Sequence, residues 1–408
     1  MTMTMTTTTS IRVLLFISFI YFGGLISFSD SFVVIPPTTT TRTRTTKTVD
    51  SSFSSSHHRQ NTTPSKVLLQ NSFLDNLFQN ENGSKTSSSR RGRPKVERPL
   101  DFVPPEPKPL QLSPSTDLIK FTKAAIAFAL RLGTGTFVLG WKLDTLFYDN
   151  NNNNNNDDDN SSNDGDNPLL YSLRLGPFSV RDTSSVLSNK NDVPRPTIPL
   201  VLYEYDSSPY CKRVREMINL LDLTVEYRPC PGARDGKFST ELYEKTGRRT
   251  VPYLYDPNTD QGLFESNDQI EYLLTNYGPQ DVTSYDRKAL WPITFEGFSI
   301  FTSSLCAVVL GMPCKIKQLN ARPDNEEMIP IEIWGNEASP FVRPVREKLC
   351  SLCLPHNMIS CSRGSLNRDI MIQKTGRFQV PYLVDPNTGI EMYESEEIVK
   401  YLDTVYTV

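Results

Sequence analysis

The chain has 408 residues, which is enough for two or three ordinary domains, and its formal net charge at pH 7 is only −3. Its basic clusters at 42–47 and 90–98 lie in the N-terminal third, so the charge distribution gives no indication of a nucleic-acid partner. Three histidines supply no plausible set of zinc ligands, and seven cysteines, an odd number in a long chain, do not indicate a disulfide framework.

Residues 1–30 have the layout of a secretory signal peptide. Arg12 precedes an apolar run from Val13 to Phe22, and small residues follow the run. The run is shorter than the ~18 residues that a membrane span requires, which makes a signal anchor the weaker interpretation.

Residues 31–115 are rich in Ser, Thr and Arg and poor in acidic residues, a composition that is typical of a transit peptide and of a disordered segment alike. Together with the signal peptide, and with Phe32 close behind the expected cleavage point, this segment resembles the two-part presequence of proteins that enter the complex plastids of algae. We therefore expect a plastid (chloroplast) location, with the secretory pathway as the alternative.

Two apolar stretches, 118–141 and 291–312, predict packed helices, which we assign to a helical leader at 116–148 and a second leader or linker at 280–329. Charged residues such as Arg131 and Glu296 make either stretch a doubtful membrane span, although association with a membrane surface stays open. Between the leader and the next part of the chain, an Asn/Asp tract predicts a solvated linker at 149–196.

An internal repeat organises the C-terminal half. Residues 245–259, KTGRRTVPYLYDPNT, return at 374–388 as KTGRFQVPYLVDPNT. The match continues upstream, where Cys230 corresponds to Cys361, and we place the two modules at 197–279 and 330–408.

The periodicity of the first copy changes in a fixed order. It predicts strands at 200–205, 223–228, 253–256 and 263–265, and helices at 209–221, 238–245 and 266–277. Gly247 is expected to end the second helix. The order βαβ-α-ββ-α predicts an α/β fold with a mixed sheet flanked by helices, which is the thioredoxin-like architecture, twice in tandem.

The turn between the first strand and the first helix carries a recognisable motif. Ser208-Pro209-Tyr210-Cys211 resembles the C-P-Y-C of glutaredoxins with its first cysteine replaced by serine, and the K-R-V-R-E that continues it is similar to glutathione transferases. Over 198–278 and 330–406 the chain is similar to plastid proteins with tandem glutathione S-transferase N-terminal, glutaredoxin-like domains. The resemblance implies glutathione as ligand or co-substrate, no metal, and a thiol-containing protein as a further candidate partner.

Ser208 and its counterpart Ser339 are the candidate catalytic residues. A side chain at a helix N-terminus lies near free N–H groups that favour an anion. The resemblance implies that either hydroxyl hydrogen-bonds the glutathione thiolate, as in serine-type transferases. The alternative is plain capping, because serine before a proline such as Pro209 or Pro340 is a common way to begin a helix.

Cys211 is a weaker catalytic candidate. It stands where glutaredoxins have their second cysteine, but Val342 replaces it in the second copy. We expect a half-buried structural thiol, and we expect Cys350 and Cys353 to be core residues.

The resemblance also implies the rest of a glutathione site in each copy. A cis-proline loop would pair with the cysteinyl part of glutathione, and a Glu-Ser pair at a helix start would hold the γ-glutamyl part, beside the residues of the serine turn. These residues are Tyr210, Pro209, Val251, Pro252, Glu265 and Ser266 in the first copy, and Pro340, Phe341, Gln379, Val380, Pro381, Glu394 and Ser395 in the second.

Capping is again the alternative for the Glu-Ser pair. Ser266 and Gln269 have the spacing of a capping box, whereas Ser395 has Ile398 at that place.

Two departures from the family affect function. Asp206 and Glu337 stand where a basic residue for the glycyl carboxylate is expected, although Arg248, Arg249 and Arg377 lie near the opposite loop. The long helical domain of full transferases is not expected after either copy. We therefore expect glutathione or glutathionyl-protein binding in plastid thiol metabolism, with weak serine-type glutathione transferase activity as an extension and enzymatic status left open. A non-catalytic interaction scaffold is the alternative, and a single-cysteine oxidoreductase that uses Cys211 ranks lower.

Overall fold

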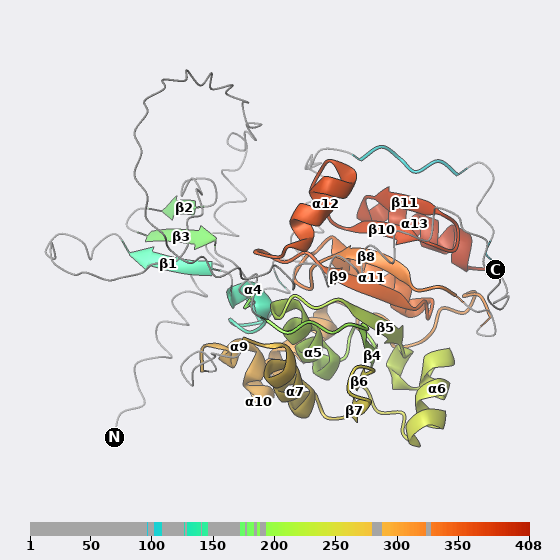
Figure 1. Ribbon diagram of the computed structural model, residues 1–408, viewed down its shortest axis with the longest axis horizontal. Coiled ribbons are helices and arrows are strands. Elements are labelled where there is room, and N and C mark those ends of the chain that lie inside the picture. Colours follow the sequence, from blue (N-terminus) through green and yellow to red (C-terminus); the bar gives the residue numbers. More distant parts are fainter. Residues whose placement is uncertain are drawn as a thin grey trace, which may run out of the picture. The chain divides into compact units, whose positions relative to one another are not determined.

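The structure is a computed structural model (Figure 1). It describes Val96 and residues 102–107, 126, 129–139, 141–145, 172–175, 178–182, 186–187, 193–279, 288–323 and 328–408. The expected signal peptide at 1–30 and most of the transit-peptide-like segment at 31–115 lie outside these residues. Among the helices within them, none combines the length and the hydropathy that a membrane crossing needs.

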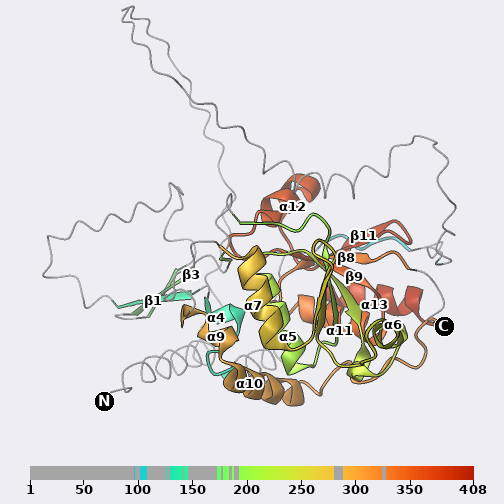
Figure 2. The ribbon, with the colours of Figure 1, turned by 60° about the horizontal axis from the view of Figure 1, so that its bottom comes forward.

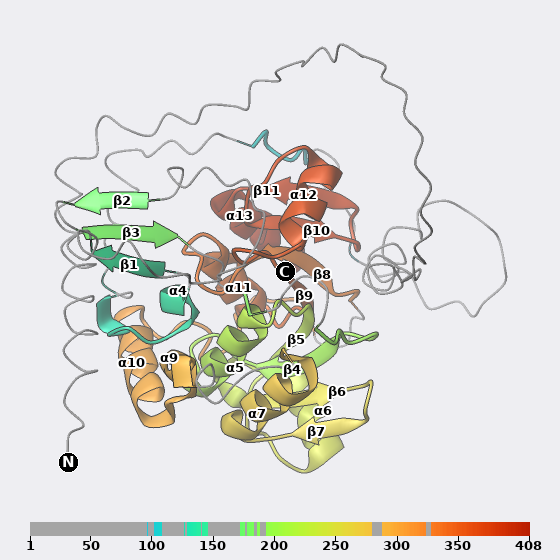
Figure 3. The ribbon, with the colours of Figure 1, turned by 60° about the vertical axis from the view of Figure 1, so that its left-hand side comes forward.

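An eight-stranded mixed sheet is the centre of the fold, and its strand order is β11-β10-β8-β9-β5-β4-β6-β7 (Figure 3). The first module contributes β4 Leu200–Glu204, β5 Val225–Pro229, β6 Tyr253–Asp256 and β7 Gln261–Leu263. The second contributes β8 Ile331–Gly335, β9 His356–Ser360, β10 Tyr382–Asp385 and β11 Ile390–Tyr393. Each module repeats one topology, so the predicted tandem thioredoxin-like fold is confirmed.

The helices lie where the periodicity predicts them. They are α5 Pro209–Leu220, α6 Lys237–Thr246 and α7 Ser266–Tyr277, with a 3-10 turn at Pro231–Ala233, and then α11 Val342–Ser351, α12 Asn367–Thr375 and α13 Ser395–Tyr406. Gly247 ends α6 with a φ of 72°, a left-handed conformation that a glycine adopts without steric cost. Strand β7 ends at Leu263, two residues before the predicted end, because Glu265 already caps α7.

The two modules join through their second strands. β5 and β9 pair antiparallel, with Glu226 opposite Asn357. These two residues occupy equivalent places in the repeat, and the flanking pairs are reciprocal, Val225 with Met358 and Tyr227 with His356. A pseudo-twofold axis therefore passes through the join, and the pairing removes an open sheet edge from each module.

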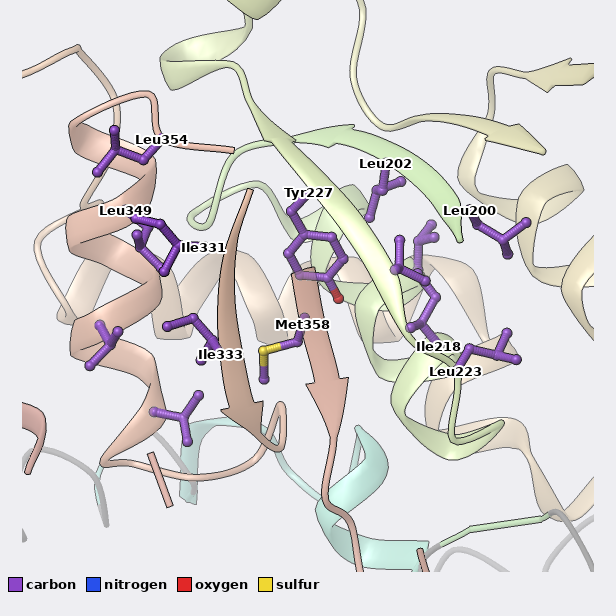
Figure 4. Packing of buried hydrophobic residues seen from close by; sticks show 14 of the residues in the cluster. Leu200, Leu202, Ile218, Leu223, Tyr227, Ile331, Ile333, Leu349, Leu354 and Met358 are labelled. Atoms are coloured by element: carbon purple, nitrogen blue, oxygen red, sulfur yellow. The ribbon is translucent and has the colours of Figure 1, made fainter. Parts of the chain in front are cut away.

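One hydrophobic core continues across the join (Figure 4). Leu202 and Ile218 of the first module belong to the same buried cluster as Ile333, Leu349 and Met358 of the second. Apolar area removed from water contributes about 25 cal/mol per Å². Separating the modules would expose part of this cluster, so we expect them to fold as a unit.

The segments outside the modules differ in part from the predictions. Helices α9 Trp291–Thr294 and α10 Glu296–Val309 agree with packed helices in the second leader. In the first leader, however, α4 Thr136–Leu139 is followed by strand β1 Trp141–Thr145. The predicted linker at 149–196 contains strands β2 Ser172–Leu175 and β3 Phe178–Asp182, which form an antiparallel sheet with β1.

The signal for these strands is weak but present. SLRL and FSVRD alternate apolar and polar residues, and Gly176-Pro177 between them is a turn signal. The neighbouring Asn/Asp tract dominates the composition, which is why the segment resembles a linker as a whole.

Candidate functional site

In the first module the serine turn is a helix cap. Ser208 precedes Pro209 at the start of α5, and its Oγ accepts a hydrogen bond from the N–H of Cys211 at 3.2 Å. The side chain of Ser208 is buried, whereas Tyr210 next to it is exposed. Ser207 donates to the carbonyl of Pro313, so the segment after α10 lies against this turn.

In the second module the turn is more open. Helix α11 begins at Val342, two residues later than Pro340, and Pro340-Phe341 belong to a turn instead. Ser339 Oγ accepts from the N–H groups of Phe341 and Val342, both at 3.3 Å. Ser339 is only half-buried, so its O–H remains available as a donor to a ligand.

Cys211 is completely buried, so the expectation of a half-buried thiol was wrong. Burial raises the pKa of its thiol to about 12, and the nearby Glu204 carboxylate acts in the same direction. A thiolate is the nucleophilic form of cysteine. The environment of Cys211 therefore weighs against the oxidoreductase hypothesis. Cys350 and Cys353 are buried as expected.

The loop before β6 and β10 carries a cis peptide bond in both modules, at Val251-Pro252 and Val380-Pro381, as the resemblance implied. In the part of the chain that the structure describes, the backbone groups of Val251 and Val380 make no hydrogen bond. Such an unpaired extended residue can pair with the backbone of a bound peptide.

The Glu-Ser pairs occupy the same strained position twice. Glu265 and Glu394 have φ values of 41° and 69°, and they cap α7 and α13. Left-handed conformations of non-glycine residues cluster at ligand sites. Each of the two glutamates is followed by a serine at the first helical position. The first backbone N–H groups of a helix have no partner within the helix and can bind an anion.

Gln269 does not form the predicted capping box with Ser266. Its side-chain amide donates to the carbonyls of Pro252 at 2.9 Å and Leu263 at 2.8 Å instead. It thereby connects the cis-proline loop to the start of α7. Gln379 has a related role in the second module, where it donates to Glu394 at 2.8 Å.

The two serines differ in what surrounds them. Ser266 is buried, and its Oγ accepts a hydrogen bond from Nη1 of Arg213 at 3.0 Å. Arg213 is itself fully buried and also donates to the carbonyl of Ile293 at 3.1 Å. The second copy has Pro344 in place of Arg213, and Ser395 is half-buried with no hydrogen bond to its hydroxyl within the described residues.

Asp206 and Glu337 form ion pairs between the modules. Arg215 Nε donates to Glu337 at 3.2 Å, and Arg346 Nε donates to Asp206 at 3.1 Å. Lys212 adds a third cation 3.2 Å from Glu337. Burial alone would raise the pKa of Glu337, but Arg215 and Arg346 hold it well below its usual range. The carboxylates of Asp206 and Glu337 are therefore part of the interface between the modules.

Of the residues proposed for the site, the structure brings the cis-proline loop and the Glu-Ser pair together in each module through Gln269 and through Gln379. Sequence reasoning missed Arg213. The sequence did contain a signal for it. Residues 212–216 are KRVRE and the equivalent residues 343–347 are RPVRE, so Arg213 is a cation that the second copy replaces with proline.

Comparison with known proteins gives one family match and one similar solved structure. The family model described as glutathione S-transferase, N-terminal domain, matches residues 202–281 and again 334–407. One similar solved structure is "Leishmania TDR1 - a unique trimeric glutathione transferase", which is 14% identical, with 52% of this chain and 68% of that chain covered and a TM-score of 0.20. No curated protein sequence matches the chain.

Proposed function

We propose that this protein, with its two glutathione S-transferase N-terminal domains, binds glutathione or glutathionyl proteins, and that the second module is the principal site. The observation that carries the proposal is the pair Glu394-Ser395. Its strained backbone sets a serine with an uncommitted hydroxyl at the start of α13, beside the cis-proline loop.

Each part of the tripeptide has a matching group in this module. The γ-glutamyl carboxylate would accept hydrogen bonds from the N–H and hydroxyl of Ser395. The cysteinyl backbone would pair with Val380, as an added strand does. The thiolate would accept from Ser339, whose Oγ already accepts from two backbone N–H groups and keeps its proton for donation. Stabilising a thiolate in this way is what weak serine-type transferase activity requires.

The first module would bind glutathione more weakly. Ser266 is buried, with its Oγ accepting a hydrogen bond from Arg213, and Ser208 is buried as a helix cap. Ser395 and Ser339 of the second module are only half-buried, so a ligand has less access to the two serines of the first module. We propose that this module mainly supports its neighbour.

Calorimetric titration of the full chain with glutathione tests the proposal. Glu394→Ala combined with Ser395→Ala should abolish most of the binding heat. The matched control, Glu265→Ala with Ser266→Ala, alters the equivalent pair of the first module and should leave most of the heat. Equal loss in both variants would contradict the asymmetry. The absence of heat from the unaltered protein at millimolar glutathione would overturn the binding function.

A non-catalytic scaffold is the second candidate. It is favoured by Asp206 and Glu337, which replace the expected basic residue and are used in inter-module ion pairs. If the scaffold function is correct, glutathione should leave the urea midpoint of unfolding unchanged, and affinity capture with the full chain should recover a protein partner. A ligand-dependent rise in the midpoint would count against it.

We further propose a plastid location, on the grounds of the presequence-like segments at 1–30 and 31–115. Fusing 1–115 to a fluorescent protein in an algal cell tests this proposal. Fluorescence that coincides with chlorophyll is expected, and removal of 1–30 should leave it in the cytosol. Fluorescence in the medium would favour secretion instead.

A further inference from the structure

Helix α10 turns its polar side chains toward the protein. Its buried residues are Ser299, Thr302, Ser303 and Cys306. Thr302 shares a hydrogen bond of 2.8 Å with Thr134, and Ser303 accepts from Arg131. The helix contacts α5 and α9 (Figure 2). A surface helix of a globular protein ordinarily has the opposite arrangement, with its apolar face inward.

The outward face of α10 is apolar. Phe301 is 61% exposed and Val308 is 58% exposed. The half-buried Leu305 lies between them at helical spacing, which places the three residues along one side of the helix. No charged residue occurs between Glu296 and Lys315, so this side carries no charge of its own. A contiguous apolar surface of this kind marks an interaction site.

The apolar surface continues past the helix into a loop that carries basic residues. Ile316 is 71% exposed and Leu319 is 99% exposed. The charged residues of 297–322 are Lys315, Lys317 and Arg322, all of them basic. Large apolar side chains and lysines thus alternate at this end of the segment.

Glu296, at the first residue of α10, is engaged by the protein. Glu296 accepts a hydrogen bond from Asn267 at 2.6 Å and lies 3.8 Å from the Arg213 guanidinium. The outward side of α10 therefore carries no charge, and the loop after it carries Lys315 and Lys317, with the Asp235 carboxylate 2.9 Å from the backbone nitrogen of Lys317.

We propose that α10 and residues 310–319 form a docking surface for a membrane that contains anionic lipids. The apolar side chains would enter the boundary between headgroups and acyl chains, and Lys315 would meet the lipid phosphates. A second copy of the chain could also cover an apolar stripe. Two such segments, however, would bring basic loops together, whereas an anionic surface turns the same charges into an attraction.

Flotation of the full chain with lipid vesicles tests the proposal. The probes are phosphatidylcholine vesicles with and without phosphatidylglycerol. Phe301→Gln combined with Val308→Gln removes the apolar stripe, and the matched control, Ile198→Gln with Ile372→Gln, alters two exposed apolar residues elsewhere. All forms keep the apolar run at 13–22, so differences between them report on α10.

We expect the unaltered protein and the control to float with anionic vesicles, and the Phe301→Gln/Val308→Gln variant to partition at least about tenfold less. Lys315→Glu should weaken binding to anionic vesicles only. Equal flotation of all forms would overturn the proposal, as would failure of the unaltered protein to float. A change from dimer to monomer in sedimentation, without an effect on flotation, would identify the surface as a contact between copies instead.

Discussion

Arg346 donates to the carboxylate of Asp206 across the boundary between the two modules, with Nε 3.1 Å from Oδ1. Arg215, the equivalent of Arg346 in the first copy, donates to Glu337, the equivalent of Asp206, at 3.2 Å. The partners are exchanged between the copies, as they are in an isologous dimer. The two modules therefore resemble a twofold dimer whose subunits have become parts of one chain.

Breaking one of these pairs should destabilise the whole protein. Arg346→Met leaves Asp206 buried without its principal cation and also removes the pair of Arg346 with Glu337 in the same module; breaking a buried pair costs on the order of 3–5 kcal/mol. Urea unfolding at neutral pH measures the loss. The control Lys400→Met removes the solvent-exposed pair with Glu397 and should cost no more than about 0.5 kcal/mol. Equal midpoints for the two variants would show that the inter-module pair contributes little.

Acid should destabilise the protein through His356. Burial lowers its pKa from 6.5 to about 4, and the Arg346 cation acts in the same direction. Below pH 6.5 the unfolded chain binds a proton that the folded chain does not bind. This group should therefore lower stability by at most about 3 kcal/mol between pH 6.5 and pH 4, whereas Glu204 and Glu347, whose pKa values burial raises to about 7, act in the opposite direction over the same range.

His356→Gln should flatten that part of the curve of unfolding free energy against pH. His356 lies on β9 opposite Tyr227, so the same experiment probes the join between modules. Unfolding by urea at several pH values provides the measurement. An unchanged slope in the variant would assign the acid sensitivity to another group.

All seven cysteines should be unreactive in the folded protein. They are free and buried, and burial raises the pKa of Cys211 to about 12 and that of Cys350 above its usual value. Thiolates, the reactive form, are therefore scarce at these two positions, and burial keeps a reagent from the other five thiols. A thiol titration with a disulfide reagent should detect almost none before denaturation and seven afterwards. One fast-reacting thiol, lost in Cys211→Ser, would revive the oxidoreductase hypothesis.

Gly262 makes room for the hydroxyl of Tyr253. A Cβ at this position would lie 1.9 Å from that oxygen. In the second module Glu391 replaces the glycine and accepts a hydrogen bond from Tyr382, the equivalent of Tyr253. Gly262→Ala should cost about 1–3 kcal/mol in the free energy of unfolding. Gly297→Ala, where a Cβ meets open space, is the control and should not destabilise.

A second substitution, Tyr253→Phe, tests whether the tyrosine hydroxyl is the reason for the loss of stability in Gly262→Ala. If the tyrosine hydroxyl is the obstacle, Gly262→Ala should be less costly in the Tyr253→Phe background than alone. Additive losses in the double variant would instead indicate that β7 needs the backbone freedom of glycine.

Much of the fold follows from local pattern. The repeat of KTGR and VPYL, the alternation of 200–205 and the helical spacing of 266–277 reflect short-range sterics and hydrophobic periodicity, which neighbouring residues determine. The resemblance likewise placed the cis-prolines and the Glu-Ser pairs correctly on their elements.

By itself the sequence determined two thioredoxin-like modules and the positions of their candidate glutathione residues. Only the tertiary structure decided which groups those residues meet. Glu226 pairs with Asn357 between the modules. Arg346 donates a hydrogen bond to Asp206, and Arg213 donates one to Ser266. These contacts join residues that are distant in the chain, and their energies depend on burial and on partner geometry. Local spacing carries no information on either burial or partner geometry. That Ser395 is accessible to a ligand while Ser266 is buried became evident only in the folded protein.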